Sequence, residues 1–264
     1  MVRTLMKHEF VRTRSALALI GVIPLLLVLV GWALGSLSAP VGALTFGLGI
    51  VSAFALPLVV QLYLAVDLYK STFGRRGYLT HTLPVEGRTL VLTKTLHMLL
   101  VCLATLLWSV LLLVLSGWSG ETMHAWRVDD ILEPLRWLWA ERPGFVAFGL
   151  CTVVGLYLVS MTYYVFAVTV GSEAWINRHG GLGPVVTFVI LYAATQVLGM
   201  LAFLIPPNYN LTDGSIDWSL PITHMVGDPE DAFLPISMFL IGYVIGAVLI
   251  WRSVVSVTRK LELR

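Results

Sequence analysis

Six apolar runs constrain this chain more than any other feature of its sequence. Each run is about 20 residues or longer, which is the length at which an α-helix crosses a hydrocarbon core about 30 Å thick. Only 12% of the 264 residues are charged and 58% are hydrophobic, whereas about a quarter of the residues of a soluble domain are charged. We therefore predict an all-α integral membrane protein with six transmembrane helices. The predicted spans are Ala16–Leu37, Ala43–Leu64, Leu92–Trp118, Phe145–Val170, Pro184–Ile205 and Phe233–Val254.

The first apolar run also has features of a secretory signal, because cations precede it and the sequence LSAP follows it. The run is longer than the roughly 7 to 15 residues of a typical signal, and a second run begins almost at once after Pro40. We therefore expect it to be retained as a span. Nothing between the spans is long enough for a soluble domain, so residues 1–264 are predicted to form a single membrane domain.

The cations of the chain fall on one side of the predicted spans. With the N-terminus inside, only Arg127, Arg136 and Arg142 of the 17 Lys and Arg residues lie outside, which leaves 14 inside, while 10 of the 15 acids lie outside. Lys and Arg near spans are retained in the cytoplasm, so both termini are predicted to be cytoplasmic in a multi-pass protein of the cell membrane. The basic inner rim faces anionic lipid, and a net charge of +2 does not imply nucleic acid.

Three segments outside the spans have patterns of their own. Residues 1–15 place apolar side chains at helical spacing, which predicts an amphipathic helix in the inner interface. Such a helix is either a topological anchor or a lever that touches a cytoplasmic partner. In the outer segment 119–143, Asp129 or Asp130 can cap a short helix that rests on the outer leaflet. The outer segment 206–232 is long and rich in helix breakers, and we expect it to pack as a cap.

The sequence has none of the motifs that mark common catalytic sites. It lacks the GxxxxGK[ST] phosphate loop, the HExxH zinc motif, the GxSxG nucleophile motif and paired histidines at metal spacing. Cys102 and Cys151 fall in different predicted spans, so neither a disulfide nor a metal site follows from them. No catalytic, cofactor-binding or metal-binding residue is therefore predicted. An active site assembled inside the membrane from distant spans is the alternative.

Polar residues inside the spans are sparse and therefore informative, because each is costly in hydrocarbon unless protein or water surrounds it. Asp67 and Glu173 lie at cytoplasmic ends of spans, so the chain lacks the intramembrane carboxylates that a proton-coupled carrier would need. The second and fifth spans carry our candidates for lining a translocation path. These candidates are Gln61, Tyr192, Thr195, Gln196 and Gly199. The alternative is that such side chains form hydrogen bonds between packed helices.

The cytoplasmic segment 71–91 holds more than the cations of a plain inner loop. Its core, GYLTHTLPV, predicts one or two helical turns with an apolar face, which Pro84 ends. A short ridge of this kind suits docking into a groove on another protein. The cations around it, Arg75, Arg76, Arg88 and Lys94, are expected to act mainly as lipid-side anchors.

The run GYLTHTLPV, followed by Arg88 and by Lys94 at the start of a span, resembles the first cytoplasmic loop of permease subunits of type-2 ATP-binding-cassette (ABC) exporters. The pattern in that family is a Gly, an aromatic residue or Thr, Leu, a few variable residues, then LPV and a downstream Lys. The plan of the whole chain is also similar, with an interfacial N-terminal helix, six spans, both ends inside and a structured outer segment before the last span. Related loops often carry an acid before the glycine, where this chain has Arg75 and Arg76.

The resemblance implies a permease whose loop forms a coupling helix on a separately encoded ATPase. ATP and Mg would be bound by that ATPase, and this chain would hold no cofactor. Expected partners are the ABC ATPase, membrane lipid, and either a second permease copy or a homologous permease; homodimer and heterodimer both stay open. The resemblance implies export of a hydrophobic or amphipathic substrate, such as a drug, a peptide or a lipid-like molecule. The coupling residues would be Gly77, Tyr78, Leu79, Thr82, Leu83 and Pro84.

Two alternatives to the permease come from other functional classes. One is a membrane protein that binds partners without transport, for example an assembly partner or an immunity-type protein. The other is the membrane-embedded enzyme, whose active site would be assembled from several spans.

Overall fold

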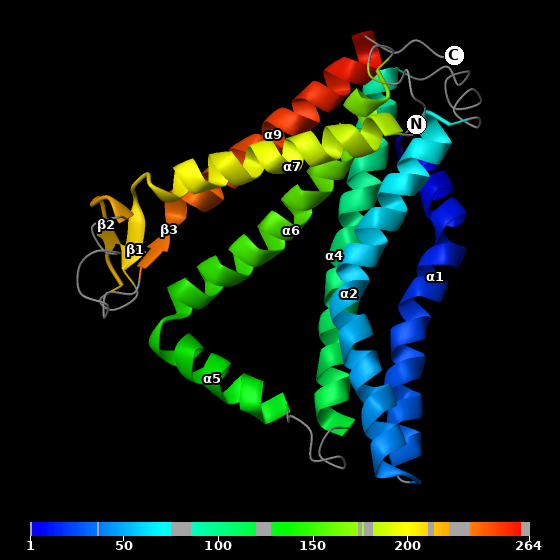
Figure 1. Ribbon diagram of the computed structural model, residues 1–264, viewed down its shortest axis with the longest axis vertical. Helices are drawn as coiled ribbons and strands as arrows, with labels where there is room; N and C mark the ends of the chain where they lie inside the picture. Colours follow the sequence, from blue (N-terminus) through cyan, green and yellow to red (C-terminus); the bar gives the residue numbers. More distant parts are fainter. Residues whose placement is uncertain are drawn as a thin grey trace. The chain divides into compact units, whose positions relative to one another are not determined.

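The computed structural model describes residues 2–35, 37–74, 86–119, 128–173, 176, 182–210, 214–221 and 233–259. Within these residues, six helices are long and apolar enough to cross a membrane. This confirms the predicted all-α membrane protein with six spans, while the side of the membrane on which the termini lie stays a prediction. The six helices are α1 (Val2–Gly35), α2 (Ala39–Thr72), α4 (Gly87–Ser119), α6 (Pro143–Gly171), α7 (Leu182–Phe203) and α9 (Ile236–Arg259), as Figure 1 shows.

α1 runs without a break from Val2 to Gly35, so the predicted separate interfacial helix over residues 1–15 is wrong. No Gly or Pro stands between residues 2 and 20 to end the helix, and Pro24 lies further along, inside it. At 34 residues, α1 is about 51 Å long, whereas the hydrocarbon core of a bilayer is about 30 Å thick. The N-terminal turns are therefore an extension of the first span.

α2 and α4 are also longer than the spans predicted for them. α2 continues past the predicted end at Leu64 to Thr72, and α4 begins at Gly87 instead of Leu92. The added turns contain charged residues, which lower the mean hydropathy of a window without stopping a helix. Three neighbouring helices of the chain are thus long enough to extend about 20 Å beyond a hydrocarbon core.

The chain folds as two compact units, each of which gathers segments that are distant in the sequence. Unit 1 consists of residues 1–68 and 92–151, and unit 2 consists of residues 69–91 and 152–264. The boundary falls inside α2 and α4, so the ends of these helices that flank segment 75–85 belong to unit 2. The short helix α5 (Val128–Glu141) belongs to unit 1 and confirms the helix predicted within segment 119–143.

In unit 1, α1, α2 and α4 lie side by side (Figure 1). α1 and α2 approach closely at Gly31, where an added Cβ would lie 2.6 Å from the backbone nitrogen of Phe46. α4 is joined to α1 by Trp108, whose Nε1 donates a hydrogen bond of 3.0 Å to the carbonyl oxygen of Gly21. Small residues and interhelical hydrogen bonds are the usual means of packing helices in lipid, where no hydrophobic force drives the helices together.

In unit 2, a three-stranded antiparallel sheet lies at one end of α7 and α9 (Figure 1). Its strand order is β2 (Ile216–Asp217), β1 (Asn208–Asn210) and β3 (Phe233–Pro235). The predicted sixth span therefore began too early, because residues 233–235 pair with β1 and the helix starts at Ile236. Asn208 is buried in the sheet, and its Nδ2 donates to the carbonyl oxygen of Ser219 at 2.8 Å.

The close approach at Gly31 makes a testable prediction. Gly31→Val should lower the thermal unfolding midpoint in detergent, because the new side chain would overlap the backbone of α2; overpacking of this kind costs about 1–3 kcal/mol. Gly47→Val is the matched control, since a Cβ at Gly47 has no neighbour within 4 Å. An equal fall in the midpoint for the two variants would contradict the packing described here.

Candidate functional site

Four charged side chains meet where α1, α2 and α4 come together in unit 1, and we call them the unit 1 cluster. Arg12 bridges two carboxylates, because its Nη2 lies 2.5 Å from Oε2 of Glu9 and also pairs with Oδ2 of Asp67. Nζ of Lys94 lies 3.5 Å from Oε1 of Glu9. Negative and positive groups therefore alternate along the chain of contacts from Asp67 to Lys94.

Lys94 is the most buried member of the unit 1 cluster, with 5% of its surface exposed. The expectation that Lys94 serves as a lipid-side anchor is therefore wrong. Removing an ammonium group from water costs several kcal/mol, which a nearby carboxylate has to offset. Glu9 supplies that carboxylate from α1, and its own side chain is only 12% exposed. Arg88, on the same helix, is exposed as expected.

A second set of contacts joins the same part of α1 to α4. The hydroxyl of Thr13 donates to the carbonyl oxygen of Glu9 at 3.0 Å and lies 3.3 Å from Nε2 of His97. The Thr13 hydroxyl therefore contacts both its own helix and a side chain of α4. The ring of Phe10 meets the ring of His97 edge-on, with 4.4 Å between the centroids. Ion pairs and packing together therefore hold the N-terminal turns of α1 against α4.

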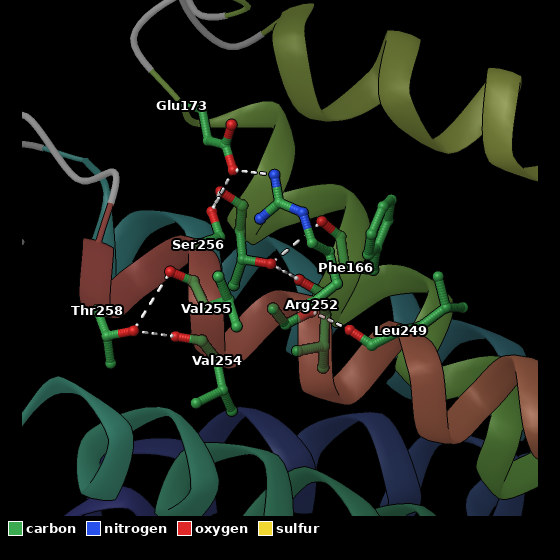
Figure 2. A network of polar contacts seen from close by, with 11 residues as sticks. Phe166, Glu173, Leu249, Arg252, Val254, Val255, Ser256 and Thr258 are labelled. Carbon is green, nitrogen blue, oxygen red and sulfur yellow. Dashed lines mark hydrogen bonds and ion pairs between the residues drawn. The ribbon is translucent and has the colours of Figure 1, made fainter.

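Unit 2 contains its own buried carboxylate, Glu173, which is 2% exposed and follows the end of α6. Figure 2 shows Arg252 and Ser256 reaching it from α9. Nη2 of Arg252 and Oγ of Ser256 both donate to Oε1 of Glu173, at 2.7 Å and 2.8 Å. We call these three residues the unit 2 cluster. It ties the end of α6 to the last turns of α9.

The two ends of segment 71–91 that the structure describes also belong to unit 2. A Cβ at Gly87 would lie 3.6 Å from the side chain of Val257 on α9, so the start of α4 is in contact range of the end of α9. Ser71 and Thr72, at the end of α2, are buried. The predicted coupling residues Gly77, Tyr78, Leu79, Thr82, Leu83 and Pro84 lie outside the described residues.

The candidates for a translocation path lie in different units. Gln61 is buried inside unit 1 with 3% of its surface exposed, whereas the other four candidates lie on α7 in unit 2. Tyr192 and Gln196 are exposed there, and Thr195 and Gly199 are half-buried. The hydroxyl of Thr195 donates to the carbonyl oxygen of Tyr192 at 2.9 Å, within its own helix. A path shared by Gln61 and α7 stays a prediction.

The aromatic rings beside these candidates form a short stack in unit 2. The Tyr164 ring lies parallel to the Phe188 ring, with 4.9 Å between the centroids, and Tyr192 follows Phe188 at 6.3 Å. α6 and α7 thus pack through Tyr164 and Phe188, and Tyr192 extends the stack onto the exposed part of α7.

The described residues hold no group of three or more His, Cys, Asp or Glu side chains placed to bind a metal ion. Neither cysteine forms a disulfide; Cys102 is buried and Cys151 is exposed. The charged side chains of the two clusters tie helix ends together. The sequence patterns did not predict these ion pairs. Lys94 and Glu173 could have indicated them, because charged residues beside apolar runs are expected to pair.

The buried position of Lys94 predicts a loss of stability when its charge is removed. Lys94→Met should lower the free energy of unfolding by roughly 3 kcal/mol, because Glu9 then lacks one of its two cationic partners. Adding Glu9→Gln to Lys94→Met should recover part of the loss, since no unpaired charge is left between α1 and α4. Thermal unfolding in detergent measures both effects. Arg88→Met, at an exposed site on the same helix, should change the midpoint little, and an equal loss there would argue against the ion pair.

The unit 2 cluster predicts a specific role for one hydroxyl. Ser256→Ala removes a hydrogen bond to a buried carboxylate and should cost about 1.5–3 kcal/mol of unfolding free energy. Thr258→Ala is the control, because the exposed Thr258 hydroxyl donates only to Val254 and Val255 of its own helix (Figure 2). Matching midpoints for the two variants would show that Glu173 does not need Ser256.

No protein-family model, curated protein or solved structure matches this chain.

Proposed function

We propose that this chain is the membrane-spanning permease subunit of an ABC exporter of the type-2 family. It would move a hydrophobic or amphipathic substrate with energy from ATP that a separate nucleotide-binding subunit hydrolyses. The sequence of the loop between α2 and α4 carries the proposal, because GYLTHTLPV followed by Arg88 and Lys94 resembles the coupling loop of that family. The six membrane-length helices of the described chain agree with such a subunit.

The unit 1 cluster supports the proposal because it braces the helices that lead into the loop. Asp67 lies about two helical turns before segment 75–85, and Lys94 about two and a half turns after it. Both are tied to α1, through Arg12 and Glu9 respectively. A loop that receives force from a motor needs rigid stems, since a flexible stem would absorb the displacement. The ion pairs supply that rigidity near the ends of α2 and α4 that flank the loop.

Unit 2 offers a route by which displacement of the loop would reach other helices. The first turn of α4 is in contact range of Val257 on α9, and Arg252 of α9 is ion-paired with Glu173 at the end of α6. In the proposed mechanism, closure of the ATPase subunits shifts the loop, and these contacts carry the shift to α9 and α6. The cycle would then alternate between states open to either side of the membrane.

The substrate class rests on two features of the sequence. The spans supply apolar and aromatic surfaces, and the outer segment 206–232 carries five acids and no Lys or Arg. Such surfaces favour a hydrophobic or amphipathic molecule, and the acids would favour one with positive charge. ATP and Mg belong to the partner in this proposal, since the sequence contains no phosphate loop.

The proposal predicts that an ATPase binds the apolar face of the loop. Tyr78→Asp combined with Leu83→Asp should reduce co-purification of a P-loop ATPase from native membranes at least tenfold, because charges would disrupt an apolar contact. The matched control is Thr80→Asp, which adds a charge in the same loop but off the predicted face. Amounts of ATPase per permease are read by quantitative mass spectrometry after affinity capture.

Two results would overturn the proposal. One is that native membranes yield no P-loop ATPase with the intact chain, which would favour a partner-binding protein without transport. The other is an enzymatic activity of the purified chain that needs no nucleotide and is lost on replacing a small set of Ser, His or acidic residues. ATP-dependent movement of a substrate into inverted vesicles, lost in the Tyr78 and Leu83 variant but kept in the Thr80 variant, would support it.

A further inference from the structure

α1 and α2 each contain a proline inside the predicted span, and both prolines lie in unit 1. A proline has no backbone N–H, so Pro24 cannot donate to the carbonyl oxygen of Ile20. For the same reason, Pro57 cannot donate to the carbonyl oxygen of Ala53. Within hydrocarbon such a carbonyl has to accept from another part of the protein, because no water is present to supply a donor. A helix also bends most readily at a break of this kind.

The two breaks lie at the same level of unit 1. α1 and α2 follow each other as an antiparallel pair, in which Gly31 lies against the backbone of Phe46. Seven residues make about two helical turns. Seven residues further from the turn that joins the helices, Pro24 on α1 therefore comes opposite Ala53 on α2. The break in each helix thus faces the break in the other.

Two successive residues of α4 supply hydrogen-bond donors at this level. Oγ of Ser109 donates to the carbonyl oxygen of Ala53 at 2.6 Å. This is the carbonyl that Pro57 deprives of its helical donor, and both Ser109 and Ala53 are buried. Nε1 of Trp108 donates to the carbonyl oxygen of Gly21 at 3.0 Å, about one turn before the proline of α1. α4 therefore binds both helices where their own hydrogen bonding is weakest.

The parts of unit 1 on either side of this level are braced by contacts of their own. On the side of the loop, the ion pairs of the unit 1 cluster join α1 to α2 and to α4. On the other side, α1 and α2 meet closely at Gly31, and hydrogen bonds to the carbonyl oxygen of Leu34 close the turn between them. α4 contains no Pro or Gly in residues 88–116, so it passes the same level without a break.

The geometry points to a hinge at Pro24 and Pro57, about which the ends of α1 and α2 beyond the two prolines swing as one body against α4. This body consists of residues 25–35 and 39–52, and we call it the hairpin. Trp108 and Ser109 hold the described position, since each bond is a side-chain contact that can break without opening the rest of a helix.

A hinge lets one part of a bundle move between two positions while the contacts inside each part are kept. A bend of about 20° at Pro24 would displace Leu37, thirteen residues further along, by about 7 Å. A rigid kink would instead keep a single position. The inference does not rest on transport or on an ATPase, because it concerns contacts inside unit 1 alone.

Distances between spin labels, measured by double electron–electron resonance on the full chain in detergent, test the swing. Both native cysteines are first replaced by alanine. Labels at Leu37 and Val114, which we call the hairpin pair, measure the hairpin against α4 beyond the hinge. Labels at Leu62 and Leu96, the reference pair, lie on α2 and α4 on the side of the loop. All four side chains are exposed.

Removing both donors should free the hairpin. Trp108→Phe combined with Ser109→Ala should widen or shift the distances of the hairpin pair by about 5 Å and leave the reference pair unchanged. Thr105→Val is the matched control, because the Thr105 hydroxyl donates within its own helix, and it should change neither pair. An unchanged hairpin pair would show a rigid kink, and equal widening of both pairs would show general loosening; either result would overturn the hinge.

Restoring the helical bond tests whether Ser109 acts through the break. Pro57→Ala supplies an N–H for the carbonyl oxygen of Ala53, so Ser109→Ala should then widen the hairpin pair less than it does beside the proline. Ser109→Thr keeps the hydroxyl and should leave the hairpin pair unchanged. Equal widening by Ser109→Ala with and without Pro57 would overturn the inference. No result in this series depends on an ATPase, so the proposed function and the hinge can fail separately.

Discussion

The ion pair between Glu9 and Lys94 is the interaction on which the rest of unit 1 depends. Lys94 is almost fully buried, and a lone buried ammonium group would destabilise the chain by several kcal/mol. Glu9 comes from a part of α1 that hydropathy would assign to the membrane surface, and it is drawn against α4 to meet that charge. Arg12, also on α1, pairs with both Glu9 and Asp67, so the ion pairs join α1 to α2 as well as to α4.

The charged side chains of the unit 1 cluster lie near one end of three long helices. α1, α2 and α4 are each about 50 Å long, and each carries its members of the unit 1 cluster within a few turns of the same end of the bundle. The helix ends near the loop carry charges, and a charge that is buried between helices has to be offset by an opposite charge. The ion pairs of the unit 1 cluster do this and join the three helices near that end. The stems of the loop at 75–85 are therefore braced by charge, in contrast to the spans, which meet at glycines such as Gly31.

The sequence predicted what depends on hydropathy and missed what depends on tertiary contact. Six spans follow from apolar length alone, and α5 followed from its apolar side. The predicted caps of α5 were wrong, because the helix begins at Val128 and contains both Asp129 and Asp130. The N-terminal extension of α1 was mistaken for a separate helix, because an amphipathic pattern is the same for a helix on a membrane and for one packed against a neighbour. β3 was counted as part of a span because Phe233 and Leu234 are apolar, and only the pairing with β1 distinguishes them. Lys94 and Glu173 were visible as charges, but their partners lie 85 and 79 residues away along the chain.

The buried charges of both units follow the same rule. Lys94 pairs with Glu9 inside unit 1, and Glu173 pairs with Arg252 inside unit 2. A buried carboxylate or ammonium group without a partner would destabilise its unit by several kcal/mol, so each pairing has to form as the unit folds. Each unit therefore offsets its own costly charges with side chains that are distant in the sequence but belong to the same unit.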